Sequence, residues 1–550
     1  MQELHCDILI AGSGLGGTAA ALAAAETGAH VILTGETGWL GGQATEQGVP
    51  LDEHPWIEQF GCNASYRRFR DGVRAHYRRN YPLSYAAQKD RTLNPGAAWV
   101  SGLSFEPRAG RAVLEEMLAP LRSAGLLRFL PGLKPAAVEC RGDRIEAVLF
   151  RESRGERELL ISARQIIDAT ELGDLLPLAR VEYVTGAESI HETGEPSAPE
   201  TADPLKQQGF THLAAVDYIP GGNFVIEKPA NYAKFRPRFE SLCAFGCGMT
   251  SLFAPGMLDE SGEMVRLPEY KKCIWNFRRV LCRGNFRPGV FPSDITMLMN
   301  GNECRGVPLV GIGEEARRRA LAEARELTLS LIYFLQTELE NAQGGCGFPG
   351  IRLRGDVFGT SDGLAPYPYI REARRIRAEF TVKEQHFRRD WPGNEKGPVK
   401  FFDSIGVGGY RIDVHEPPKS SHNGATNVTD ALTGTSHLQQ IPLGSLIPVR
   451  MENLLAGCKN IGSTHLTNGC FRLHCTEWNI GEAAGALAAF ALARKSSPRA
   501  VRNTPELLAD FQRLLIRRGV ELDWTIPSCG QSYAGYHSGI PDWYWGEARP

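Results

Sequence analysis

The feature that most constrains this chain is a glycine-rich turn near its N-terminus. The sequence GSGLGG at residues 12–17 stands between an apolar run at 8–11 and an alanine-rich stretch at 18–25. A second apolar run, at residues 30–33, comes next. The order is therefore strand, glycine turn, helix and strand. In this setting a G-x-G-x-x-G pattern indicates a dinucleotide-binding site, whereas the bare pattern would be weak in a chain with 60 glycines.

Each glycine of the pattern has a physical role. Gly12 permits the tight turn, Gly14 lets the backbone approach a pyrophosphate, and Gly17 lets the helix pack closely on the strand. The first turn of the helix adds unpaired N–H groups and a partial positive charge for the phosphates. We therefore predict that Gly12, Ser13, Gly14 and Gly17 bind a dinucleotide.

Two features favour FAD over NAD. The turn stands at the start of the chain, and Leu40-Gly41-Gly42-Gln43 follows the second strand. An acidic residue is expected at the end of that strand, where it would bind the ribose hydroxyl groups. Here the strand runs into Thr34-Gly35-Glu36, so Glu36 is the candidate.

Three stretches carry a resemblance to a known family. GSGLGG, then GETGWLGGQATEQGVPLDEHPWIEQFG, and near the C-terminus GEAAGALAAFAL resemble the FAD-dependent oxidoreductase family of the glutathione-reductase-like flavoproteins. The resemblance covers residues 1 to about 60 and about 400 to 495. It implies FAD as a non-covalent cofactor. In that family the ribose carboxylate usually stands one position earlier, at Gly35 here, so Glu36 would act after a small backbone shift.

The resemblance also implies where the rest of the cofactor site lies. The Gly-Gly pair passes close to the flavin, small residues after the third strand lie beside the cofactor, and the last helix points its N-terminus at the flavin. The positive end of that helix would stabilise charge on the reduced ring. The further cofactor-binding candidates are Gly41, Gly42, Gln43, Val138, Ala169, Thr170, Gly457, Asn460 and Arg472.

The expected fold class is α/β, with a Rossmann-like FAD-binding domain that contains a three-stranded β-meander and an inserted α+β substrate domain. We divide the 550 residues into an FAD-binding domain at 1–185, a substrate domain at 186–440, the C-terminal part of the FAD-binding domain at 441–500, and a terminal helix with an aromatic tail at 501–550.

Hydrophobic periodicity and breaker residues place the individual elements. Helices are expected at 65–79, 111–124, 314–341, 371–380, 476–493 and 505–518. The meander strands are expected at 136–140, 145–152 and 158–162, with a separate buried strand at 165–170, a final parallel strand at 453–457 and a loop at 458–468.

Charge and cysteine usage exclude several classes of function. Lysine and arginine total 61 against 63 acidic residues, which argues against nucleic acid as a partner. The uncharged run at 8–25 is split by the glycine turn, so we expect no membrane span. Without a basic N-terminal region for a signal peptide, we expect the cytoplasm. The 13 cysteines show no framework spacing, which indicates free thiols and no metal site.

The flavin would carry the redox chemistry, and the protein must position the substrate and manage a proton. Histidine suits that task at neutral pH. The candidates are His474, His465 and His415, with His437 a weaker fourth. His465 and His474 flank residues 469–472, just before the helix that would face the flavin.

These features predict an FAD-dependent dehydrogenase or oxidase that removes a hydride from a small organic molecule at a C–OH, C–N or C–C bond. Oxygen or another acceptor would reoxidise the flavin. One alternative is a flavin monooxygenase that uses NAD(P)H, although no second G-x-G-x-x-G follows a strand. Another is an FAD-holding partner protein without catalysis. The identity of the substrate stays open, and the aromatic run at 542–545 leaves a homo-oligomer open.

Overall fold

The computed structural model describes residues 2–524 with several short gaps. The gaps are residues 55, 153–154, 156, 260–261, 263, 265–271, 342–344, 389–390, 395–397 and 417–437. His437 and the aromatic run at 542–545 therefore lie outside the described residues.

A parallel sheet forms the centre of the nucleotide-binding part of the molecule. Its strands follow the order β3-β2-β1-β6-β19, and every neighbouring pair is parallel. Ile10 in the central strand β1 lies opposite Leu33 on one side and Ile167 on the other. These strands are β1 (Gln2–Ala11), β2 (Val31–Gly35), β3 (Leu127–Pro131), β6 (Glu158–Asp168) and β19 (Leu454–Ala456). The expected Rossmann-like α/β fold is confirmed.

A three-stranded antiparallel meander extends the same sheet beyond β6. It consists of β4 (Leu133–Arg141), β5 (Arg144–Glu152) and the first half of β6, which pair antiparallel. The prediction of separate strands at 158–162 and 165–170 was wrong, because residues 158–168 form the single strand β6, which ends before Ala169 and Thr170. Strand β1 pairs with β6 along almost its whole length, from Gln2 opposite Leu159 to Ala11 opposite Asp168. Pairing with β1 keeps the backbone of β6 extended at residues 163–164, between the two strands that were expected to be separate.

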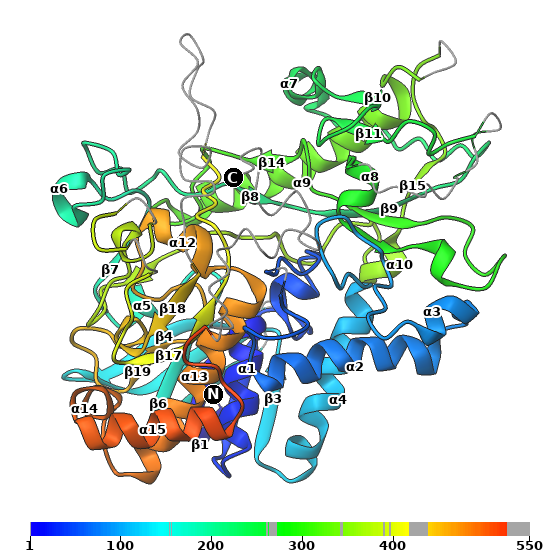
Figure 1. Cartoon of the computed structure of the whole chain (residues 1–550). Helices are drawn as coiled ribbons and strands as arrows, with labels where there is room; N and C mark the ends of the chain where they lie inside the picture. Colours follow the sequence, from blue (N-terminus) through cyan, green and yellow to red (C-terminus); the bar gives the residue numbers. More distant parts are fainter. Residues whose placement is uncertain are drawn as a thin grey trace.

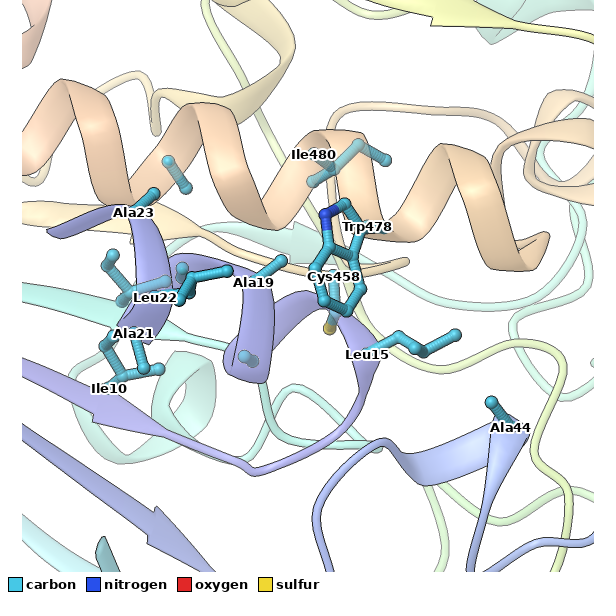
Figure 2. Packing of buried hydrophobic residues seen from close by; sticks show 14 of the residues in the cluster. Ile10, Leu15, Ala19, Ala21, Leu22, Ala23, Ala44, Cys458, Trp478 and Ile480 are labelled. Carbon is cyan, nitrogen blue, oxygen red and sulfur yellow. The ribbon is translucent and has the colours of Figure 1, made fainter. Parts of the chain in front are cut away.

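Two small-residue helices lie side by side against this sheet. In Figure 1, α1 (Leu15–Ala25) and α13 (His474–Ala493) run together although they come from opposite ends of the chain. A Cβ atom on Gly481 would lie 2.0 Å from the carbonyl oxygen of Gly16, and one on Gly485 would lie 2.2 Å from that of Ala20. The two backbones are therefore in direct contact. Figure 2 shows Trp478 projecting from α13 toward the first turn of α1.

A second core belongs to the inserted part of the chain, the upper green layer of Figure 1. Its four-stranded antiparallel sheet has the order β12-β13-β9-β15, and the helix α9 (Glu314–Thr337) packs its leucines into the same core. The strands are β9 (Ala214–Tyr218), β12 (Arg279–Leu281), β13 (Ile295–Leu298) and β15 (Ile351–Leu353). They lie within the expected substrate domain at 186–440. The three boundaries between the four expected segments stay predictions.

Two expectations for the connecting segments were wrong. Residues 371–380 do not form a helix, because Arg375 and Ile376 form the short strand β16 (Arg375–Ile376) and pair with β7 (Tyr183–Val184). The expected loop at 458–468 is present only as far as Thr464, because His465 begins the helix α12 (His465–Phe471). Thr464 caps this helix by accepting a hydrogen bond from the N–H of Thr467.

The other helices are mostly peripheral, and their bounds agree with expectation to within a few residues where one was made. They are α2 (Ala64–Asn80), α3 (Tyr85–Lys89), α4 (Pro107–Ser123), α5 (Leu175–Leu178), α6 (Ile190–Thr193), α7 (Tyr232–Phe235), α8 (Ile274–Phe277), α10 (Gly355–Phe358), α14 (Pro498–Asn503) and α15 (Pro505–Arg517). The remaining strands are β8 (Phe210–Thr211), β10 (Cys243–Phe245), β11 (Ser251–Phe253), β14 (Glu303–Cys304), β17 (Ser404–Gly408) and β18 (Gln439–Pro442). None of the helices in the described part of the chain combines the length and the apolar character that crossing a bilayer requires.

Candidate functional site

Backbone contacts at the glycine turn leave no room for side chains at two positions. Gly12 has a φ of +106°, and a Cβ atom there would lie 2.0 Å from the carbonyl oxygen of Ala169 at the end of β6. A Cβ on Gly17 would lie 1.8 Å from the carbonyl oxygen of Gly12. These contacts hold the turn tightly between the sheet and the first turn of α1, as a phosphate-binding turn requires.

The amides of the turn are available to an anion. The backbone N–H groups of Ser13 and Gly14 have no hydrogen-bond acceptor among the described residues. In the described part of the chain, a Cβ on Gly14 would meet two atoms within 4 Å, a carboxylate oxygen of Glu171 at 3.1 Å and one of Glu477 at 3.5 Å. Buried amides without a partner are rare in proteins. This donor pair therefore fits the diphosphate of a dinucleotide.

The loop after β2 closes over this turn. Gly41 and Gly42 have φ values of +98° and +46°, which glycine adopts without strain. The N–H of Gly41 donates to the carbonyl of Ser13 at 2.8 Å, and a Cβ on Gly42 would lie 2.8 Å from the Cα of Gly14. Gln43 Nε2 then donates to the carbonyl of Arg472 at 3.0 Å and to Glu477. The loop thus joins the glycine turn to the start of α13.

A small cavity of about 30 Å³ opens beside the turn. Glu36 lines it, so the structure brings the expected ribose ligand to the glycine turn. Glu46 and Glu171 line it too, and burial raises the pKa of Glu36 to about 7 and that of Glu46 to about 8. Among the described residues, the lining consists of Gly12, Ser13, Gly14, Glu36, Thr37, Glu46, Leu133, Pro135, Ala169, Thr170, Glu171 and Tyr367.

Of three other cofactor candidates, Gly457 and Asn460 lie at the ends of the central strands, whereas Val138 lies in the meander. Gly457 and Asn460 both hydrogen-bond to the backbone carbonyl of Asp168, at 2.8 and 3.0 Å, and so join the ends of β19 and β6. Val138 lies opposite Val148 within the meander and is not part of the cavity lining, which Leu133 and Pro135 supply from the same strand.

His474 is buried and holds two backbone segments together. Its Nδ1 accepts a hydrogen bond from the N–H of Asp52 at 3.0 Å, and its Nε2 lies 3.2 Å from the carbonyl of Val49. Burial lowers the pKa of His474 to about 4, so the ring is neutral at physiological pH. A neutral ring with Nδ1 accepting and Nε2–H donating satisfies both contacts. His474 thereby attaches the loop after β2 to the first residue of α13.

His465, at the start of α12, lies among carboxylates. Its Nδ1 is 2.8 Å from Glu372 and its Nε2 is 3.2 Å from Glu416. Burial opposes the charged form, but these two carboxylates outweigh it and raise the pKa of His465 to about 9. His465 lines a pocket of about 130 Å³ that is separate from the cavity beside the glycine turn.

His415 is the third candidate, and it lines a larger cavity of about 290 Å³. Its Nδ1 lies 2.6 Å from Glu303 and its Nε2 lies 3.1 Å from Asp413. Burial opposes ionisation of both acids. Nevertheless Arg371 and His415 hold the pKa of Glu303 well below its ordinary value, and His415 together with Arg411 does the same for Asp413. The cavity therefore contains an imidazole between two ionised carboxylates.

Arginine side chains dominate the rest of this cavity. Five cationic side chains line its described part, namely Lys272, Arg278, Arg305, Arg371 and Arg411. Trp99, Phe277 and Tyr410 supply aromatic surface. Arg278 also reaches the loop after β2, with both terminal nitrogens 3.4 Å from the Asp52 carboxylate. The cavity thus borders the loop that His474 holds against α13.

Arg472 connects the same cavity to α13. Its guanidinium donates to the hydroxyl of Tyr369 at 2.6 Å and to the backbone carbonyl of Asp413 at 3.1 Å. Its backbone carbonyl accepts from Gln43. Arg472 therefore lies between the Gly-Gly loop and the His415 cluster. No local motif marks Asp52, Arg278, Glu303 or Arg371, which come from four separate segments, so sequence reasoning missed them.

Comparison with solved structures gives only distant likenesses. The geranylgeranyl bacteriochlorophyll reductase-like protein of Thermoplasma acidophilum is 10% identical, over 94% of this chain and 85% of its own, with a TM-score of 0.33. The glycerol-3-phosphate dehydrogenase of Bacillus halodurans complexed with FAD is 12% identical over 39% of this chain, with a TM-score of 0.22. The L-proline dehydrogenase of P. horikoshii is 18% identical over 34%, with a TM-score of 0.18.

The chain spans 40% of the length of the Bacillus enzyme and 24% of that of the proline dehydrogenase. With TM-scores this low, none of the three likenesses carries an argument about this chain. No curated protein matches the sequence significantly.

The family comparison is decisive, in contrast. The family described as FAD dependent oxidoreductase matches residues 7–515, which include the glycine turn, the inserted domain and α13. FAD is thus the cofactor, as the resemblance of the three sequence stretches implied. The chain belongs to the FAD-dependent oxidoreductase family.

Proposed function

We propose that this protein is a dehydrogenase or oxidase that removes a hydride from a small organic substrate at a C–OH, C–N or C–C bond. The observation that carries the proposal is the place of His415. Of the three candidate histidines, His415 alone lines the 290 Å³ cavity, whereas His474 is enclosed by backbone and His465 lines a different pocket. The cavity borders the loop that closes over the glycine turn.

The residues at the turn would hold the cofactor. The free amides of Ser13 and Gly14 would bind the diphosphate, and Glu36 would bind a ribose hydroxyl group. Gly41, Gly42 and Gln43 would lie along the flavin. Bound there, FAD supplies the hydride acceptor, and the protein supplies orientation and the proton acceptor.

His415 would take the proton of the substrate's O–H or N–H group. Both ring nitrogens lie next to ionised carboxylates, so in this proposal the O–H or N–H group of the bound substrate displaces Glu303 from Nδ1 before Nδ1 accepts the proton. Asp413, 3.1 Å from Nε2, fixes the ring and stabilises the resulting imidazolium. The substrate carbon then gives up its hydride, so that the C–OH group becomes C=O or the C–NH group becomes C=N. His474 and Arg472 have positioning roles, because both attach the loop after β2 to α13.

Anaerobic reduction of the flavin tests the proposal. The purified yellow protein is mixed without oxygen with separate pools of alcohols, amines and organic acids, and the visible flavin band is followed. We expect at least one pool to bleach the band, and its active component to appear oxidised at the alcohol or amine carbon. Rapid oxidation of NADPH without substrate, with no bleaching by any pool, would contradict the proposal and favour a monooxygenase.

A further inference from the structure

The 290 Å³ cavity has a chemistry that points to one class of substrate. We propose that it binds a small organic carboxylate, whose anionic end pairs with Arg371 and Arg278 and whose carbon body lies against the aromatic wall. This inference rests on the proposed function for its meaning as a substrate site. The binding site itself can be tested without any redox reaction.

Charge is the first support. Cationic side chains outnumber carboxylates among the described residues of the lining by five to two, the two acids being Glu303 and Asp413. Guanidinium groups bind carboxylates through parallel N–H donors, which gives both strength and orientation. A neutral alcohol or a cationic amine would not use this surface.

The hydrogen bonding of the Arg371 side chain is a second, independent observation in support of a carboxylate site. Its side chain is 2% exposed and lines the cavity. Its Nη1 donates to the carbonyl of Gly209 at 2.6 Å and to the hydroxyl of Thr211 at 3.2 Å, and it lies 3.0 Å from Glu303. Its Nε, however, has no hydrogen-bond partner among the described residues. A buried guanidinium donor without an acceptor is costly, and a bound carboxylate would satisfy it.

Arg278 supplies a second donor group close to the loop after β2. Its contacts with the Asp52 carboxylate are long, 3.4 Å from each terminal nitrogen, and its contact with the carbonyl of Pro50 is 3.5 Å. These distances are at the outer limit of hydrogen bonding, so the guanidinium retains donor capacity. A carboxylate between Arg278 and Arg371 would lie in the same cavity as His415.

The apolar side of the cavity fits the rest of such a molecule. Trp99 and Phe277 form part of the wall, and their ring centroids lie 5.8 Å apart. The volume of about 290 Å³ is at the lower end of the range for small-molecule sites. We therefore expect an acid of modest size with an apolar or aromatic body, and choose benzoate as the probe.

Isothermal titration calorimetry of the FAD-loaded protein tests the inference, with benzoate, benzamide and inorganic phosphate as ligands. Benzamide has the same shape as benzoate without its charge. We expect benzoate to bind at least about tenfold more tightly than benzamide, because charge-assisted hydrogen bonds exceed neutral ones in strength. Phosphate binding as tight as that of benzoate would overturn the carboxylate assignment, as would equal binding of benzoate and benzamide or no binding of either.

Variants locate the binding. Arg371→Gln should weaken benzoate binding about tenfold or more. Arg305→Gln is the second variant, since Arg305 is 35% exposed at the rim and pairs with Glu303, so its loss is tolerated more easily by the fold. It should weaken benzoate binding about threefold, whereas Arg318→Gln on the exposed face of α9 should have no effect. Unchanged affinity in both Arg371→Gln and Arg305→Gln would place benzoate elsewhere and contradict the inference.

The inference and the proposed function fail in different ways. Benzoate binding with the expected charge dependence, but without flavin reduction by any substrate pool, would leave the anion site standing and overturn the proposed function. Flavin reduction by a neutral alcohol, without charge-dependent benzoate binding, would support the proposed function and overturn the anion site.

Discussion

The carboxylate of Glu477 on α13 accepts a hydrogen bond from the backbone N–H of Gly16 at 3.3 Å, although the two residues stand 461 positions apart in the sequence. Glu477 also accepts from the side chain of Gln43. A single buried acid therefore joins the first turn of α1, the Gly-Gly loop and the last long helix. Its position at the N-terminus of α1 uses the positive end of the helix dipole.

Removal of this carboxylate should destabilise the protein. Glu477→Ala would leave the N–H of Gly16 buried without its acceptor, and the amide of Gln43 would lose one of its two acceptors and keep the carbonyl of Arg472. We expect a loss of about 3 kcal/mol in the free energy of unfolding, measured by urea denaturation. Glu506→Ala, at an exposed position on α15, is the matched control and should cost less than about 1 kcal/mol. Equal effects of the two substitutions would show that the Glu477 contacts do not support the fold.

A second prediction concerns the backbone contact between α1 and α13. In Gly481→Ala the new methyl group would lie 2.0 Å from the carbonyl oxygen of Gly16, so the helices must separate. We expect a loss of at least about 3 kcal/mol in stability, together with a lower FAD content because the first turn of α1 moves. In Gly102→Ala no atom of the described residues lies within 4 Å of the new methyl group, so this substitution should change neither quantity. A Gly481→Ala protein with wild-type melting behaviour would contradict the observed packing.

The acidic cavity beside the turn should make stability depend on pH. Burial raises the pKa of Glu46 from 4.5 to about 8, so the fold favours the protonated acid. Its contribution to apoprotein stability is fully present below about pH 4.5 and is lost progressively as the pH rises to about 8. Over that window the wild type should lose about 1 kcal/mol per pH unit relative to Glu46→Gln, measured by denaturation of both proteins at several pH values. Parallel pH profiles for the two proteins would contradict the prediction.

The same acids should affect cofactor binding. Glu36 and Glu46 line the small cavity beside the glycine turn, where the diphosphate of FAD would bind. In their ionised form both acids would therefore repel the diphosphate. FAD affinity of the apoprotein should therefore fall as the pH rises through about 7 to 8, the range in which both acids lose their protons. Fluorescence titration with FAD measures this, and Glu46→Gln should flatten the dependence. An affinity that rises with pH would argue against this placement of the diphosphate.

The proposed role of His415 separates catalysis from cofactor binding. His415→Gln should slow anaerobic flavin reduction by about 10²- to 10⁴-fold, the usual contribution of a positioned proton acceptor. The FAD content should stay unchanged, since His415 is absent from the lining of the cavity at the glycine turn. His474→Ala should instead loosen the loop at Val49 and Asp52 and lower FAD retention. An unchanged rate in His415→Gln would remove that residue from the mechanism.

Local patterns in the sequence were sufficient for much of the fold. The strand at 8–11, the turn and helix that follow it, and the long helices α9 and α13 depend on periodicity and small residues that a short window contains. Strand β1 itself begins earlier than expected, at Gln2. Residues 371–380 show the limit. Their Arg-, Glu- and Ala-rich composition favours a helix, but Arg371 and Arg375 are buried beside Glu303 and Glu188, and these partners keep the chain extended. Tertiary contacts overrode the local propensity.

The candidate site shows the same limit more strongly. Glycines 12, 14 and 17 stand within six residues and were recognisable by spacing alone. The cluster around His415 brings together Asp52, Arg278, Glu303 and Arg371 from distant segments, and nothing in their spacing indicates that they meet. The sequence does not distinguish His474 from His415, because only the fold shows which imidazole is enclosed by backbone.

Reconstitution with FAD tests the central claim most directly. The wild-type apoprotein and Gly14→Val are each incubated with FAD, freed of unbound flavin, and compared by visible absorbance. A valine side chain at Gly14 would occupy the space between the turn and Glu171, next to the free amides. We expect the wild type to retain about one flavin per chain and Gly14→Val to retain none while folding normally by circular dichroism. A fully yellow Gly14→Val protein, or a colourless wild type, would contradict the account.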